Sequence, residues 1–197
     1  MPTYNAEISA GSLMPLESRR IASLLLSSPD DAAWLHAIEI DNILQKKTPA
    51  TARRQATLIR KRLLTLDATG WQLIAERESE VSRQLLLAAA VKHSQLLGDF
   101  IRNVYAVRQR KLEAALAATD WADFLADCSH HDPAVASWSE STKAKLREVI
   151  VRILVEAKYL ENSRSMKLTP PSLHPDVRRY LHDRHETYAL DCLERAR

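Results

Sequence analysis

The segment NILQKKTPATARRQATLIRKRLLTL, from Asn42 to Leu66, is the part of the chain from which the fold can best be inferred. A turn at Lys46–Ala50 separates a preceding apolar stretch from a run in which apolar residues recur with the period of an α-helix. At 3.6 residues per turn, five of them form one stripe: Ala52, Ala56, Ile59, Leu63 and Leu66. The segment therefore predicts an amphipathic helix that packs its apolar side on a partner helix.

Charge is distributed very unevenly between this segment and the rest of the chain. The 25 residues contain no acid and seven bases, namely Lys46, Lys47, Arg53, Arg54, Arg60, Lys61 and Arg62. The whole chain carries a net charge of only +3, so the other residues sum to −4. Segregated charge costs self-repulsion in a folded protein and is typical of a surface that binds a polyanion. The competing interpretation is a solvated basic helix without a partner.

The residues before this segment predict a helix that leads into the turn. Ser28-Pro29-Asp30-Asp31 combines a hydroxyl cap, a proline at the first helical position and acids in the first turn. The helix that starts there is expected to end near Gln45. With the basic helix it forms a helix-turn-helix unit over about residues 30–66, a motif in which the second helix enters the major groove of DNA.

The turn and the exposed side of the basic helix supply the candidate DNA contacts. The first turns of a recognition helix approach base edges, where arginine fits the two acceptors of guanine. The bases of the turn and the backbone N–H groups of the helix start are expected to hold phosphate. The candidate DNA-binding residues of this unit are Lys46, Lys47, Thr48, Thr51, Arg53, Arg54, Thr57, Arg60 and Lys61.

A second, weaker unit is expected at about residues 120–160. Its basic helix, Ser141–Leu154, aligns without gaps with Thr51–Leu64 at an offset of 90 residues. Beyond Val149 apolar residues occupy both sides of this helix, so only its first turns are expected to be open to a ligand. The candidate DNA-binding residues there are Ser141, Thr142, Lys143, Lys145 and Arg147.

The remaining sequence predicts an all-α fold, a compact multi-helix globule. Only three glycines occur, and Leu, Ala, Arg and Glu are abundant, as in helices joined by short turns. Further helices are expected at about 16–27, 71–78, 80–93, 94–108, 112–118, 120–129, 139–160 and 175–197. We expect an N-terminal lobe at 1–112 and a C-terminal lobe at 113–197, with a small β-wing at 162–173 as an alternative to a loop.

Several classes of protein are disfavoured by the composition. No apolar run approaches the length of a membrane span, and the two cysteines lack a disulfide framework, which favours the cytoplasm. A zinc site at Cys128, His130 and His131 with His182 and His185 lacks the usual paired spacing. No glycine-rich phosphate loop or nucleophile motif is present. We therefore expect a non-enzyme with no cofactor, metal or small-molecule substrate.

Two other classes of function remain open beside DNA binding. The basic side could dock an acidic partner subunit, which would make the chain a protein-interaction scaffold. Helical bundles with arginine-rich faces also bind RNA, although the narrow major groove of A-form RNA excludes a helix. Competition between duplex DNA, RNA and protein partners separates the three classes.

The chain resembles the BrxA family, the small helical component of bacterial BREX phage-exclusion systems. The resemblance spans nearly the whole chain and is carried by the order and spacing of 4–13, 41–45, 51–54, 62–64, 119–121 and 138–143. It implies an all-helical, non-catalytic protein that binds double-stranded DNA through two helix-turn-helix units. It also implies that the protein works beside the methyltransferase, the ATPase and other BREX components.

One short segment departs from a winged-helix pattern. Winged helices often turn at a glycine after the recognition helix, whereas this chain has Ala157-Lys158-Tyr159-Leu160. Lys158 predicts that the helix continues through this point, which weighs against a true wing after Asn162.

Overall fold

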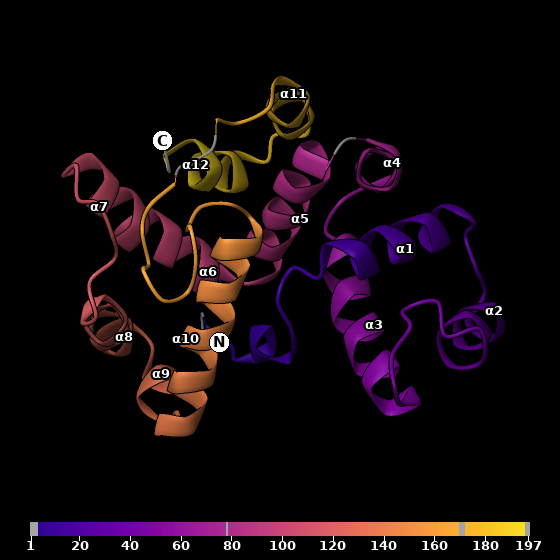
Figure 1. Ribbon diagram of the computed structural model, residues 1–197, viewed down its shortest axis with the longest axis horizontal. Coiled ribbons are helices and arrows are strands. Elements are labelled where there is room, and N and C mark those ends of the chain that lie inside the picture. Colours follow the sequence, from indigo (N-terminus) through magenta and orange to yellow (C-terminus); the bar gives the residue numbers. More distant parts are fainter. Residues whose placement is uncertain (1–3, 78, 170–171, 196–197) are drawn as a thin grey trace.

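The computed structural model describes residues 4–77, 79–169 and 172–195, and these residues form an all-α protein (Figure 1). The fold class predicted from the sequence is confirmed. In chain order the elements are η1 (Glu7–Ala10), α1 (Pro15–Leu26), α2 (Asp31–Leu35), η2 (His36–Ile40), α3 (Pro49–Leu63), α4 (Ala68–Glu76), α5 (Ser79–His93), α6 (Gln95–Phe100), η3 (Ile101–Tyr105), α7 (Ala106–Arg110), α8 (Asp120–His131), α9 (Pro133–Ala136), α10 (Glu140–Glu156), α11 (Pro175–Asp183) and α12 (Thr187–Arg195). None of the helices in the described part is long and apolar enough to cross a membrane.

Helix α5 forms the centre of the molecule. Every residue from Gln84 to Val91 is buried, so the helix is enclosed on all sides rather than along one stripe. It contacts α1, α3 and α4 on one side and α6, α11 and α12 on the other (Figure 1). The helix predicted at 80–93 is therefore a core helix shared by the two halves of the chain.

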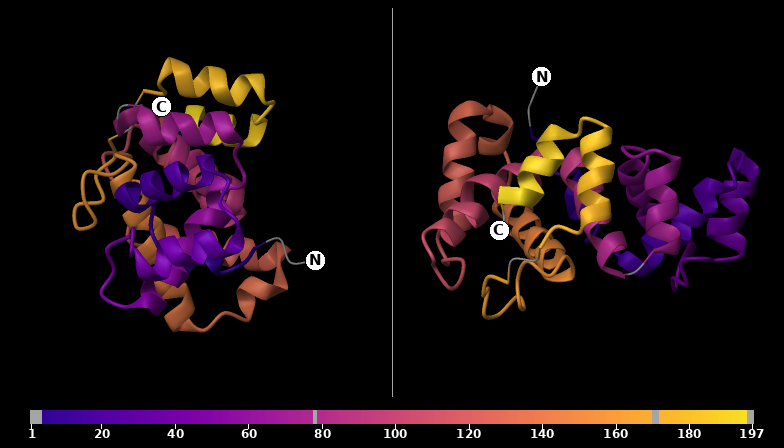
Figure 2. Two further views of the ribbon diagram at one scale, coloured as in Figure 1. Left: turned by 90° about the vertical axis from the view of Figure 1, so that its right-hand side faces the viewer. Right: turned by 90° about the horizontal axis from the view of Figure 1, so that it is seen from above.

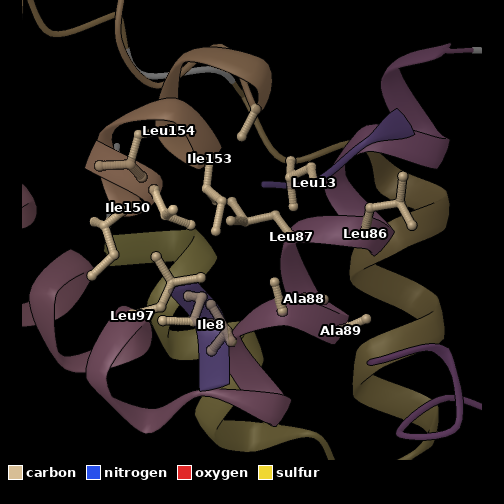
Figure 3. Close-up of a cluster of buried hydrophobic side chains, with 14 of the residues drawn as sticks. Ile8, Leu13, Leu86, Leu87, Ala88, Ala89, Leu97, Ile150, Ile153 and Leu154 are labelled. Atoms are coloured by element: carbon tan, nitrogen blue, oxygen red, sulfur yellow. The ribbon is translucent and has the colours of Figure 1, made fainter. Parts of the chain in front are cut away.

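An N-terminal strap, residues 4–14, runs between α3 and α10 before α1 begins. Its Ile8 and Leu13 are buried, and Figure 3 shows them in one hydrophobic cluster with Leu87 of α5 and Ile150 and Ile153 of α10. The element η1 within the strap contacts both α3 and α10. The strap thus contributes side chains to the same core that α5 organises, and it does so at the boundary between the two basic helices.

The helix before the basic segment differs from its prediction at both ends. Asp30, rather than Ser28, caps α2, because its carboxylate accepts a hydrogen bond from the Ala33 N–H at 2.7 Å. Ser28 instead has a left-handed backbone with φ of 50°. The helix ends at Ile40 after the π-helical η2, not near Gln45, which itself has φ of 52°.

Helix α3 confirms the amphipathic pattern and corrects it at one residue. Thr48 caps the helix and Pro49 occupies its first position. The apolar stripe predicted from the sequence, Ala52, Ala56, Ile59, Leu63 and Leu66, is buried. Arg62, which the sequence places in the basic run, is only 4% exposed and does not belong to the surface.

Two predictions for the second half of the chain are wrong, one at the α7–α8 connection and one after α10. Residues 112–118 are irregular, not helical, because Leu116 N–H donates to Met166 O at 3.1 Å and Leu168 N–H to Ala114 O at 2.9 Å. Helix α10 does not continue through Lys158, which adopts φ of 66°, the conformation usually supplied by glycine.

The segment after α10 doubles back on itself. Two isolated β-bridges, Leu160 with Leu168 and Ala115 with Lys167, hold a short projecting loop at residues 161–167. Figure 2 shows this loop standing out from the body of the molecule. It has the position of the wing considered from the sequence. The last predicted helix, 175–197, is two helices, α11 and α12, because His185 has a left-handed φ of 55° between them.

Candidate nucleic-acid interface

The first turns of α3 and α10 lie on the same side of the molecule. In Figure 1 both helices begin at the bottom of the view and run upward towards the core. Both are capped by a hydroxyl, Thr48 accepting from Thr51 N–H and Ser139 from Thr142 N–H. The caps stand 91 residues apart, one more than the offset of 90 taken from the sequence. The two helices that carry the predicted site residues therefore begin on one side of the molecule.

In the first unit, two of the predicted cations are exposed and free of acids. No carboxylate of the described residues lies within ion-pair distance of Lys47 or Arg54. Lys47 stands in the turn and Arg54 in the second turn of α3, so both point their charge at solvent. Thr51 is half-buried, and Thr57 is exposed but donates its hydroxyl proton to the Arg53 carbonyl at 2.8 Å.

The other cations of the first unit already have partners within the chain. Arg53 Nε lies 2.9 Å from a Glu39 oxygen, and Lys61 Nζ lies 3.0 Å from a Glu7 oxygen. Lys46 pairs with Glu17. Arg60 is half-buried and stacks its guanidinium over the Trp34 ring, 4.4 Å from the ring centroid. The sequence could not show these partners, since each acid lies outside the basic segment.

The second unit repeats this mixture of free and paired cations. Arg147 is exposed, with no carboxylate in ion-pair range among the described residues. Lys143 pairs with Glu140 at 2.8 Å, and Lys145 with Glu148 at 2.9 Å. Ser141 and Thr142 hydrogen-bond through their hydroxyls to Ser139 at 2.9 Å each. The buried second half of α10 is confirmed, because Val149, Ile150, Val151, Ile153 and Leu154 are all buried.

An interhelical groove of about 460 Å³ separates α3 from α10, and its walls carry bases from both units. Lys46 and Arg54 line one wall, Lys145 and Arg152 line the other, and the strap forms the floor. Arg152 was not among the residues predicted for the site. The helical period places Arg152 on the side of α10 opposite its buried residues, so the sequence already indicated that this side chain is exposed.

Two of the acids that pair with these cations, Glu7 and Glu148, have a lowered pKa. Hydrogen bonding from Lys61 is the main reason that the pKa of Glu7 lies below its ordinary value. Lys145 does the same for the pKa of Glu148, which also contacts Arg152 at 2.6 Å. Exposed ion pairs of this kind are weak because water and salt screen them, so a phosphate can replace the carboxylate at little cost.

Two arginines outside the basic helices pair with acids of other elements. Arg108 donates to both oxygens of Asp120, at 3.1 Å and 2.6 Å, and thereby fixes the start of α8. Arg102 pairs with Asp191 at 2.9 Å. Both cysteines are buried free thiols, and no group of three potential ligands in the described part of the chain is arranged to hold a metal.

Comparison with known proteins gives one consistent answer. The BrxA family profile matches residues 2–185. A protein named BREX protein BrxA from Paramagnetospirillum magneticum is 39% identical over 193 residues, which cover 98% of this chain and 97% of that protein. A protein of the same name from Escherichia coli O9:H4 is 38% identical over 175 residues, 89% and 82% of the two chains.

A solved structure has the same fold. The crystal structure of an uncharacterized protein from Magnetospirillum magneticum superposes with a TM-score of 0.90 at 38% identity, over 98% of both chains. This protein belongs to the BrxA family.

Proposed function

We propose that the protein is a component of a BREX phage-defence system and binds double-stranded DNA there, without catalysing a reaction itself. Family membership supports the BREX role, since the similar proteins carry the name BREX protein BrxA. The observation that carries the DNA-binding proposal is the pair of exposed, unpaired cations, Lys47 and Arg54, in the turn and the first half of α3, a helix that begins on the same side of the molecule as α10.

In this proposal α2, η2 and α3 act as a helix-turn-helix unit. The start of α3 enters the major groove, where Arg54 faces guanine acceptors or a phosphate and Lys47 holds a phosphate of the backbone. The start of α10 touches the duplex through Arg147 and the hydroxyls of Ser141 and Thr142. Contact with six to eight phosphates predicts a log–log dependence of affinity on salt with a slope of about −5 to −7.

A charge-reversal variant tests this function. Lys47→Glu with Arg54→Glu changes two residues that have no internal acid to release, so its fold is expected to remain intact. Fluorescence anisotropy with a duplex of about 30 base pairs should show affinity reduced at least about tenfold and a shallower salt slope. The matched control is Arg179→Glu, an exposed base on α11 at the opposite end of the molecule in Figure 1.

Equal affinity of the double variant and the control would remove the start of α3 from the interface. Competition with unlabelled ligands separates the remaining classes of function. Structured RNA that displaces the duplex more effectively than DNA would point to RNA binding. A protein that ignores both nucleic acids in dilute buffer but co-purifies with an acidic partner would be a scaffold.

A further inference from the structure

The strap is held from opposite sides by one charge of each basic helix, a buried one on α3 and a half-buried one on α10. Arg62 of α3 donates to the carbonyls of Gly11, at 2.9 Å, and Ser12. Glu156 of α10 accepts from the Leu13 N–H at 2.7 Å, from the Met14 N–H at 3.2 Å and from the Ser12 hydroxyl at 2.8 Å. Two charges of opposite sign, from two helices, therefore bind four consecutive residues of one connecting segment.

Burial makes this arrangement sensitive to geometry. Arg62 is 4% exposed, and desolvation lowers its pKa to about 10, although the Glu156 carboxylate opposes this effect. The guanidinium is thus still charged at neutral pH. A buried charge is tolerated only where its hydrogen-bond partners are correctly placed, and charge-assisted bonds are among the strongest available. Moving α3 relative to α10 would break the bonds that Arg62 or Glu156 makes to residues 11–14 of the strap.

The start of the strap is anchored as well. The Tyr4 hydroxyl donates to Asp99 of α6 at 2.8 Å, and the Tyr4 N–H donates to Asp132, the cap of α9, at 2.9 Å. Midway, Glu7 pairs with Lys61 of α3. The strap is therefore fixed at both ends and in the middle, and it leaves no slack between the two units.

We infer that the strap is a rigid spacer that sets the distance between the first turns of α3 and α10, so that both units bind one and the same duplex at a fixed separation. This inference rests on the proposed DNA-binding function and adds the form of the ligand. The interhelical groove supports it, because bases from both units face each other across the strap floor. Once one unit has bound the duplex, the second unit is held close to it at a high effective concentration. This raises the overall affinity for DNA without adding contacts to either unit.

A series of duplexes of increasing length tests the inference. On about 10 to 40 base pairs, the wild-type affinity should rise at least about tenfold once one duplex reaches both helices, with one duplex bound per protein. In Glu156→Gln this rise should shrink to less than about threefold. The direction of the change in DNA affinity is informative. Glu156→Gln removes a negative charge from the groove wall, so electrostatics alone would strengthen DNA binding.

Controls separate loss of spacing from loss of folding. Glu76→Gln removes an exposed carboxylate on α4 and should bind like the wild type. If Glu156→Gln folds poorly, Ser12→Ala takes its place. It deletes only one of the hydrogen bonds to Glu156 and should reduce the rise in affinity in part. An unchanged rise in Glu156→Gln, or two duplexes bound per wild-type protein, would overturn the inference. Absence of binding at every length would instead overturn the proposed function.

A distance measurement tests the spacer without DNA. Spin labels on Ala50→Cys in α3 and Ala144→Cys in α10 occupy exposed positions, while the native thiols Cys128 and Cys192 are buried. Burial also raises the pKa of Cys128 and Cys192, which lowers their reactivity towards the label. The distance distribution should be narrow in the wild-type background and broader with Glu156→Gln. Equal widths in the two backgrounds would contradict a spacer.

Discussion

At the scale of single residues, Arg62 shows what a charge pattern cannot reveal. The sequence counts it with six other bases, yet its side chain is buried and donates to the carbonyls of Gly11 and Ser12. Those carbonyls are some fifty positions away in the chain. Exposure of Arg53, Arg54, Thr57 and Lys61 follows from helical period alone, whereas the burial of Arg62 depends on a tertiary contact.

Replacing Arg62 by lysine should therefore destabilise the protein although charge is kept. A single ammonium cannot reproduce the guanidinium's fork to two carbonyls, so Arg62→Lys is expected to lower the free energy of unfolding by about 2–4 kcal/mol. Urea unfolding followed by circular dichroism measures this, with the exposed Arg179→Lys as a control. A loss no larger than that of the control would show that the strap carbonyls do not need both donors.

His93 predicts how stability depends on pH. Its side chain is 11% exposed, and desolvation, followed by the nearby charge of Arg62, lowers its pKa from 6.5, against the opposing effect of Glu7. The unfolded chain therefore binds more protons than the folded one as pH falls below about 6.5, and the linkage relation makes stability fall with it.

The measurement is urea unfolding at several pH values between about 7 and 5. Stability should decrease across this window in the wild-type protein and change less in His93→Gln, which cannot take up the proton. The carboxylates with lowered pKa, such as Glu7 and Asp67, lose their contribution only at more acid pH, below about 4.5, so they do not confuse the test. Parallel profiles in both proteins would exclude His93 as the cause.

At the scale of elements, strongly periodic helices were predictable and segments governed by distant pairing were not. Helices α3, α5, α8 and α10 lie within a few residues of their predicted ranges. Residues 112–118 have good helix-forming composition, but their backbone groups bond to the segment 166–168 instead. The end of α10 was mispredicted for a related reason, since the bridge between Leu160 and Leu168 requires the chain to turn at Lys158.

The packing of α6 on α12 depends on a glycine that composition alone does not explain. A Cβ added at Gly98 would overlap the Tyr188 ring, whose hydroxyl donates to Asp99 at 2.9 Å. Alanine is favoured over glycine inside a helix by about 1 kcal/mol, but overpacking costs about 1–3 kcal/mol. Gly98→Ala should therefore lower the thermal midpoint. In a Tyr188→Ala background, which lacks the ring, Gly98→Ala should instead raise the thermal midpoint. A midpoint that still falls would show that the added methyl group clashes with another residue.

At the scale of the whole molecule, the sequence predicted which side of α3 is exposed but not what surrounds it. Among the basic residues of α3 and of the turn before it, Arg53, Lys61 and Lys46 have acid partners in η2, η1 and α1, respectively. The interhelical groove arises only when the strap inserts between α3 and α10. A single sequence gives the charges but not the distances between them. Which cations are paired, and where the groove lies, can therefore be seen only in the folded chain.

The same connections predict how the molecule unfolds. The sequence suggests two lobes, 1–112 and 113–197, but α5 is buried between helices of both, and the strap ties Tyr4 and Glu7 to opposite halves. Neither half can unfold without exposing the α5 core of the other, so we expect one cooperative transition. The alternative, independent lobes joined by a linker, requires an interface that is small and polar, which the buried Leu85–Val91 segment is not.

Tryptophan reporters in each half distinguish these two behaviours. Trp34→Phe with Trp71→Phe leaves fluorescence only in the second half, and Trp121→Phe with Trp138→Phe leaves it only in the first. Trp34 and Trp121 are buried, so both variants lose some stability, and each fluorescence curve must be compared with circular dichroism of the same variant. Cooperative unfolding predicts coincident urea midpoints within each variant. If the halves unfold separately, the fluorescence midpoint will differ from the dichroism midpoint, in opposite directions for the two variants. That result would show that the strap and α5 do not couple the halves.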